Sequence, residues 1–163
     1  TQMFFAETQN KLLYAVTGET AAEIIVHRAD ASKANMALTS WKGTIVRKQD
    51  IFTAKNYLQK EEIDMLNRLT TMFLDTAELR VKERKDSTIS YWRKTIDALL
   101  SFQEKNILQN AGSISNKQME EHVSAIYAEF AERRKAIVLQ EADEQDNQYL
   151  QLLQDDLQSI RKS

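Results

Sequence analysis

The chain has 163 residues, a net charge of −2, no Pro, no Cys and only three Gly. The lack of Cys excludes disulfides, thiolate nucleophiles and cysteine metal sites. Strong helix formers are abundant, so we expect a single all-α domain over residues 1–163. No apolar run approaches the roughly 18 residues of a membrane span, and the first residues lack a signal-peptide pattern. We therefore expect a cytoplasmic protein, with secretion as an effector not excluded.

The first two predicted helices cover residues 3–17 and 21–29. The first carries apolar side chains near one face and ends at Gly18, because glycine readily adopts the left-handed conformation that ends helices. The second begins with the pattern Thr-Ala-Ala-Glu, in which Thr20 and Glu23 are placed to form a reciprocal capping box.

The following segment is the least helix-like part of the chain. Residues 30–48 show no helical period and contain Asp, Ser, Asn, Thr and Gly in close succession. This pattern predicts a long ordered loop, with a short extended piece at residues 43–46. We expect Asp50 to cap a short helix over residues 51–57.

Two longer helices follow the loop. Apolar residues recur at spacings of three and four along residues 60–85, which is typical of a helix with one buried face. Ser87 or Thr88 is expected to cap the next helix, which continues toward Leu108 and stops before Gly112. The short connection between these two helices predicts that they pack as antiparallel neighbours.

The last helix has the clearest start signal, with Ser115 as its N-cap and Gln118 as the reciprocal partner. No Pro or Gly interrupts residues 115–163, and a continuous helix of about 46 residues would extend about 69 Å. Because that length exceeds the width of the domain, we expect a projecting end or a hinge near residues 143–148. Together the segments predict a bundle of five or six helices with one irregular loop.

Charge is distributed unevenly along the chain. Residues 28–60 contain seven basic and two acidic side chains, a net charge of +5. Residues 141–163 contain two basic and six acidic side chains, a net charge of −4, together with a second apolar stripe that consists of Tyr149, Leu153, Leu157 and Ile160. A basic segment and an acidic tail therefore coexist in a nearly neutral chain.

The basic segment holds the candidate binding residues, because lysines and arginines alternate there with aromatic rings, as in surfaces that bind nucleic acids. The alternative is that Trp41 fills the core and the lysines form a solvated face. An inward or an outward Trp41 separates the two interpretations. The candidates are Arg28, Lys33, Asn35, Trp41, Lys42, Arg47, Lys48, Lys55, Asn56 and Tyr57.

Conventional catalytic and metal-binding patterns are missing from the sequence. His27 and His122 are its only histidines and lie in different predicted helices, and the glycine-rich phosphate loops and the GxSxG motif do not occur. Glu23, Asp30 and Asp50 flank the loop and could gather a divalent cation, but capping explains two of them. We therefore expect no catalytic residue, no metal and no cofactor.

Four spaced segments carry a family resemblance: FFAETQNKLLYAVTGETAAEII, RADASKANMALTSWKG, AKNYLQKEEIDMLNRLTTMFLDTAE and ILQNAGSIS. Together they resemble the C-terminal region of the RhuM family of virulence-associated bacterial proteins, over residues 3–130. The resemblance implies a bacterial protein encoded on a pathogenicity island or another mobile element, with an additional N-terminal region. The family does not imply a defined biochemical activity.

We therefore expect a non-enzymatic interaction module of a RhuM-like protein, with nucleic acid as the leading ligand of residues 28–60. One alternative is an enzyme or toxin-like effector that uses polar residues between Glu23 and Asn56. Another is a homo-oligomerisation domain that acts through the C-terminal helix. The expected partners are nucleic acid, another protein, a second copy, or the N-terminal region of the same protein, and no membrane. Because the sequence starts at Thr1 rather than Met, we expect it to be the C-terminal fragment of a longer protein.

Overall fold

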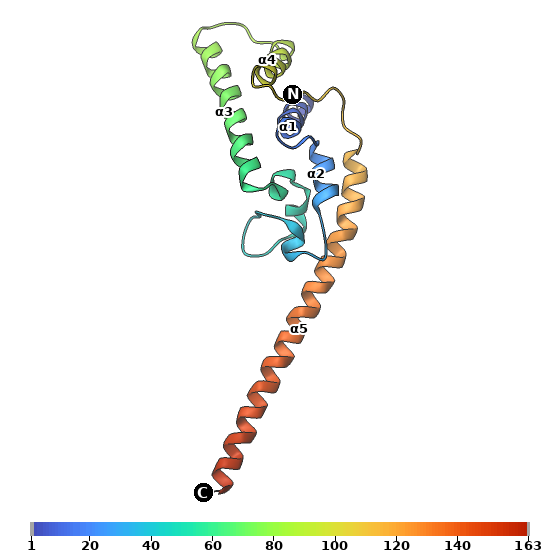
Figure 1. Ribbon diagram of the computed structural model, residues 1–163, viewed down its shortest axis with the longest axis vertical. Helices are drawn as coiled ribbons and strands as arrows, with labels where there is room; N and C mark the ends of the chain where they lie inside the picture. Colours follow the sequence, from blue (N-terminus) through green and yellow to red (C-terminus); the bar gives the residue numbers. More distant parts are fainter. Residues whose placement is uncertain (1, 163) are drawn as a thin grey trace.

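The computed structural model describes residues 2–162 and confirms the all-α prediction, with no strand among these residues. A small body of short helices is joined to one long helix that extends well beyond it (Figure 1). The elements, in chain order, are α1 (Gln2–Thr17), α2 (Ala21–Arg28), the short 3-10 turns η1 (Ala34–Ala37), η2 (Lys48–Phe52) and η3 (Ala54–Tyr57), α3 (Lys60–Lys82), α4 (Ile89–Phe102) and α5 (Asn116–Lys162).

The predicted helix starts are confirmed at the level of individual hydrogen bonds. The Glu23 amide donates to Thr20 Oγ1 over 3.4 Å, and Glu23 Oε2 accepts from the Thr20 amide over 2.8 Å. At the start of α5, the Gln118 amide donates to Ser115 Oγ over 3.1 Å. Of the two candidates before α4, Thr88 is the cap, since its Oγ1 accepts from the Tyr91 amide. These bonds satisfy amides that have no partner within their own helix.

Several predicted boundaries need correction. Instead of one short helix capped by Asp50, the chain forms η2 and η3. Asp50 lies inside η2, where its carboxylate accepts from the Arg47 amide over 2.8 Å. α4 ends at Phe102 rather than near Leu108. Glu104 follows with a φ of 54°, a left-handed conformation in which the helix cannot continue. Residues 43–45 form bends, and no strand includes residues 43–46.

The predicted antiparallel pairing of α3 and α4 is also wrong. Figure 1 shows α3 lying in the plane of the view, while α4 is seen nearly end-on, so the two helices cross steeply. They meet through the rings of Phe73 and Trp92, whose centroids lie 5.8 Å apart. α4 is held instead against α1, where Lys11 Nζ lies 2.6 Å from Asp97 Oδ1.

The core lies where α1, α2, the 3-10 turns and the first half of α5 meet. Its fully buried side chains come from every part of the body, but α5 contributes only Met119, Val123 and Phe130 to it. From residue 135 onward every described side chain of α5 is exposed. α5 runs as one helix through residues 143–148, so the projecting end is confirmed and no hinge interrupts it (Figure 1).

The segment before α5 closes against the start of α2. Ser113 donates to Glu23 Oε1 twice, from its amide over 2.6 Å and from its hydroxyl over 2.9 Å. Gly112 makes this approach possible, because its φ is +86° and a Cβ there would lie 2.6 Å from Thr20 Cγ2. The direction in which α5 leaves the body therefore depends on a residue without a side chain.

We expect Gly112→Ala to lower the free energy of unfolding by roughly 2–4 kcal/mol, because left-handed strain and a steric clash add together. Gly43→Ala is the matched control: its φ is +89°, but no atom lies within 4 Å of the new Cβ, so only the strain of roughly 1–2 kcal/mol applies. Urea unfolding of both variants measures the difference. Equal losses would contradict the proposed close contact.

Candidate interaction surfaces

The loop between α2 and η2 is ordered by a strained turn. Asn35, Met36 and Ala37 have φ values of 53°, 57° and 65°, a left-handed conformation that costs about 1–2 kcal/mol for each residue. Met36 is fully buried and Leu38 is 6% exposed. Burial of two such side chains contributes about 1.5–3 kcal/mol each, which offsets the strain. The turn therefore holds its unusual shape because it inserts apolar side chains into the core.

Hydrogen bonds tie the rest of the loop to η3. The Thr39 amide donates to the Asn56 carbonyl over 2.7 Å, and the Thr39 hydroxyl donates to the Leu58 carbonyl over 2.6 Å. The Asn56 side chain in turn donates to the Asp50 carbonyl over 2.9 Å. Asn56 is thus engaged in bracing the loop.

Two of the candidate aromatic residues are placed toward the interior. Trp41 is half-buried and packs against the core. Tyr57 is 1% exposed, its hydroxyl donates to the Ile51 carbonyl over 2.8 Å, and burial raises the pKa of that hydroxyl. The Tyr57 ring therefore cannot stack on a ligand in this conformation. Part of the Trp41 ring remains accessible.

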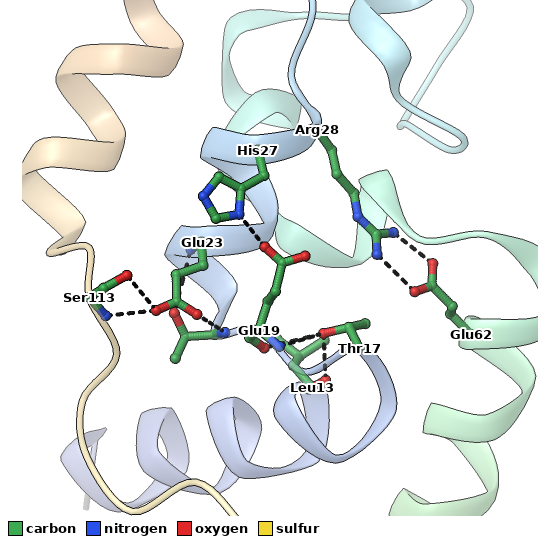
Figure 2. Close-up of polar contacts among 9 residues, drawn as sticks. Leu13, Thr17, Glu19, Glu23, His27, Arg28, Glu62 and Ser113 are labelled. Carbon is green, nitrogen blue, oxygen red and sulfur yellow. Dashed lines mark hydrogen bonds and ion pairs between the residues drawn. The ribbon is translucent and has the colours of Figure 1, made fainter. Parts of the chain in front are cut away.

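Arg28 is committed to an internal ion pair rather than to a free basic surface. Its guanidinium donates to both carboxylate oxygens of Glu62, over 2.6 and 2.8 Å (Figure 2). It also donates to the Tyr57 carbonyl over 3.1 Å. These hydrogen bonds raise the pKa of Arg28 and lower the pKa of Glu62. Arg28 therefore joins α2 to the start of α3.

The other candidates remain on the surface, where α5 adds two cations that the sequence analysis missed. Arg134 donates to the Val46 carbonyl over 2.8 Å, although 88 positions separate the two residues, and Arg133 lines the same groove as loop residues 31–35. Hydrogen bonds from Ser32 lower the pKa of Asp30, and Lys33 and Arg133 add smaller effects in the same direction. Only tertiary structure brings these arginines to the loop. The exposed candidates are Lys33, Asn35, Lys42, Arg47, Lys48 and Lys55.

An apolar groove runs between the loop and α5. It has a volume of about 400 Å³ and is lined by residues 31–35 together with Phe130, Arg133, Arg134, Ile137 and Val138. We call it the loop–helix groove. Arg134 closes one part of its floor by lying over the Phe130 ring, with its guanidinium 5.1 Å from the ring centroid. The groove thus combines an apolar floor with basic side chains.

The three carboxylates considered for a metal site are each engaged locally. Asp30 accepts from Ser32, Asp50 accepts from the Arg47 amide, and Glu23 accepts from Thr20 and Ser113. Figure 2 shows Glu23 pointing toward Ser113, away from the Arg28 pair. Among the described residues no group of three or more potential metal ligands gathers. The arrangement gives capping and bracing roles to these carboxylates.

Neither histidine stands in a catalytic arrangement in the part of the chain that the structure describes. His27 Nδ1 contacts a Glu19 oxygen at the exposed edge of α2, as Figure 2 shows. His122 lies on the exposed side of α5. The His27–Glu19 contact joins α2 to the residues just before it and brings no nucleophile into reach.

The last part of α5 forms a second surface. The apolar stripe predicted there carries Tyr149, Leu153 and Leu157, which are 64%, 42% and 61% exposed. We call these three residues the distal stripe. These apolar side chains recur at helical spacing, and the body of the chain does not cover them.

The described residues form an all-α fold with a projecting helix and an ordered loop that carries basic side chains. The chain belongs to the virulence protein RhuM family, which matches residues 1–138 and so confirms the resemblance. It is thus a member of a family of virulence proteins, and the match ends where α5 leaves the body.

No curated protein and no solved structure matches the chain. None of the described helices is both long and apolar enough to cross a membrane.

The Arg28–Glu62 pair makes stability depend on pH. Because the pKa of Glu62 is lowered in the folded state, its contribution is present above the ordinary glutamate pKa of 4.5 and is lost as the pH falls through the folded-state value. We expect Glu62→Gln to lower the free energy of unfolding at pH 7 by roughly 1–2 kcal/mol and to flatten its acid dependence. Urea unfolding between about pH 7 and pH 3 measures both effects.

Glu61→Gln is the matched control, since Glu61 lies in the same helical turn and is exposed. It should change the free energy of unfolding by less than about 0.5 kcal/mol. If the two variants had the same pH profile, Glu62 would not carry the effect.

Proposed function

We propose that this domain is a non-enzymatic self-assembly module of a RhuM family virulence protein and that α5 is its assembly element. The observation that carries the proposal is the exposed distal stripe on a helix that continues beyond its own domain. A helix of this kind buries its apolar face only when another molecule covers it. No catalytic arrangement is recognisable among the described residues, so the exposed distal stripe is the feature that best supports a function.

Helical geometry supports a partner other than the body of the same chain. At 100° per residue, Leu153 is turned by roughly 140° from Phe130, the last buried residue of α5. The distal stripe therefore faces away from the side on which α5 packs against the body. Covering it within one chain would require a break in α5, and the helix is continuous.

We expect the chain to have twice the monomer mass in light scattering, and Leu153→Gln with Leu157→Gln to weaken association by at least about tenfold through loss of apolar contact. The matched control is Leu74→Gln with Leu79→Gln, because these leucines of α3 are each 58% exposed. Glutamine preserves helix propensity in both pairs. A monomer at every accessible concentration would contradict the proposal.

Nucleic acid binding is a second candidate function, favoured by one local arrangement. Arg47 and Lys48 border a shallow pocket with the half-buried ring of Phe52, and Lys42 and Lys55 are exposed in the same loop-and-turn region. Cations beside an accessible ring suit a phosphate backbone and a stacked base. This surface lies on the body and does not use the distal stripe.

For this candidate we expect Lys42→Glu with Arg47→Glu to weaken binding of a fluorescent single-stranded oligonucleotide by at least about tenfold, with affinity that falls steeply as salt rises. Lys94→Glu with Lys117→Glu makes the same change in net charge at exposed positions of α4 and α5 and serves as the control. Fluorescence anisotropy measures the affinity. No binding of the parent chain even at low salt would exclude the function.

A further inference from the structure

The loop–helix groove has the chemistry of a site for an acidic amphipathic segment. On α5, Phe130 is buried, whereas Ile137 and Val138 are 55% and 58% exposed and leave the groove floor accessible. Lys33 from the loop and Arg133 from α5 are both exposed and line the groove. An apolar floor with cationic side chains binds a helix that carries apolar and acidic residues together.

The far end of α5 is such a helix. Leu153 and Leu157 of the distal stripe are separated by one helical turn, and Asp155 and Asp156 lie in that turn. All four side chains are exposed, and the segment that contains them has a net charge of −4. One chain therefore carries both the acidic apolar segment and the basic apolar groove.

We propose that the distal stripe of one copy occupies the loop–helix groove of a second copy, and that the exchange is reciprocal. In this dimer Leu153 packs against Val138 of the other copy, while Asp155 and Asp156 face its Lys33 and Arg133. The inference rests on the proposed self-assembly function and names the surface that receives the distal stripe.

The geometry of α5 permits the exchange to close as a symmetric pair. Val138 and Leu153 are 15 residues apart, about 22 Å along the helix, and are turned by only about 60° around it. That angle is smaller than the width of one apolar stripe, so both residues can face the same neighbour. A twofold axis between Gln145 and Asp146 then brings the distal stripe of each antiparallel helix onto the groove of its partner.

Electrostatics favours this contact over direct pairing of two tails. Two segments with a net charge of −4 repel each other, whereas Lys33 and Arg133 attract Asp155 and Asp156. Salt therefore has opposite effects on the two arrangements. It weakens a dimer in which tail and groove meet, and it strengthens a dimer in which two acidic tails meet.

The experiment uses two full-length variants, one with Lys33→Glu and Arg133→Glu in the groove and one with Asp155→Lys and Asp156→Lys in the tail. Each alone places like charges at both contacts of a symmetric dimer, and we expect each to associate at least about tenfold more weakly than the parent. A one-to-one mixture restores opposite charges at both contacts. Light scattering should therefore show a heterodimer in the mixture only.

Three outcomes separate the possibilities. Restored association in the mixture, with a parent dimer that weakens between about 50 mM and 500 mM NaCl, supports the exchange. If the groove variant dimerises like the parent and the tail variant dimerises more tightly, two tails pair directly; the exchange is then wrong, although self-assembly stands. A parent chain that is monomeric throughout overturns both. Circular dichroism of each variant, with unchanged helix content, ensures that weak association reflects the surface and not unfolding.

Discussion

Two carboxylate contacts hold α2 between the longest helices, and the remaining architecture depends on them. At its start, Glu23 receives the Ser113 amide and hydroxyl and so fixes the chain just before α5. At its end, Arg28 donates two hydrogen bonds to the Glu62 carboxylate and so fixes the start of α3 (Figure 2). Burial raises the pKa of Glu23, but the hydrogen bonds from Ser113 and Thr20 outweigh that effect and lower the pKa below its ordinary value. An eight-residue helix thereby sets the direction of two helices of 23 and 47 residues.

The irregular segment after α2 is explained by the same packing. Its left-handed turn is unfavourable in isolation, and burial of Met36 and Leu38 in the core offsets the cost. The half-buried Trp41 packs against the core, and part of its ring remains accessible. Because the loop is held from the inside, its lysines are left on the surface. A structural role for the loop and a binding role for its cations are therefore compatible.

Charge and apolar surface are separated along α5. Its first part is anchored in the body and supplies Arg133 and Arg134 to the groove, while its far part supplies acidic and apolar side chains with no cover from the body. A single continuous helix thus carries both surfaces. It cannot bring its own two halves together, which supports the proposed contact between molecules. The family match ends near the boundary between these two parts.

The sequence by itself determined the helical class and the capping residues of α2 and α5, because these depend on local propensity and on bonds within a few residues. It left Ser87 and Thr88 as alternative caps of α4, and a projecting end or a hinge as alternatives for α5. It also located the basic segment and the acidic tail. Tertiary structure alone decided the steep crossing of α3 and α4 and the early end of α4. It also decided that Arg28 and Asn56 form hydrogen bonds within the body, that Tyr57 is buried, and that Arg133 and Arg134 reach the loop. Those features depend on contacts between residues far apart in the chain, and no local pattern records such contacts.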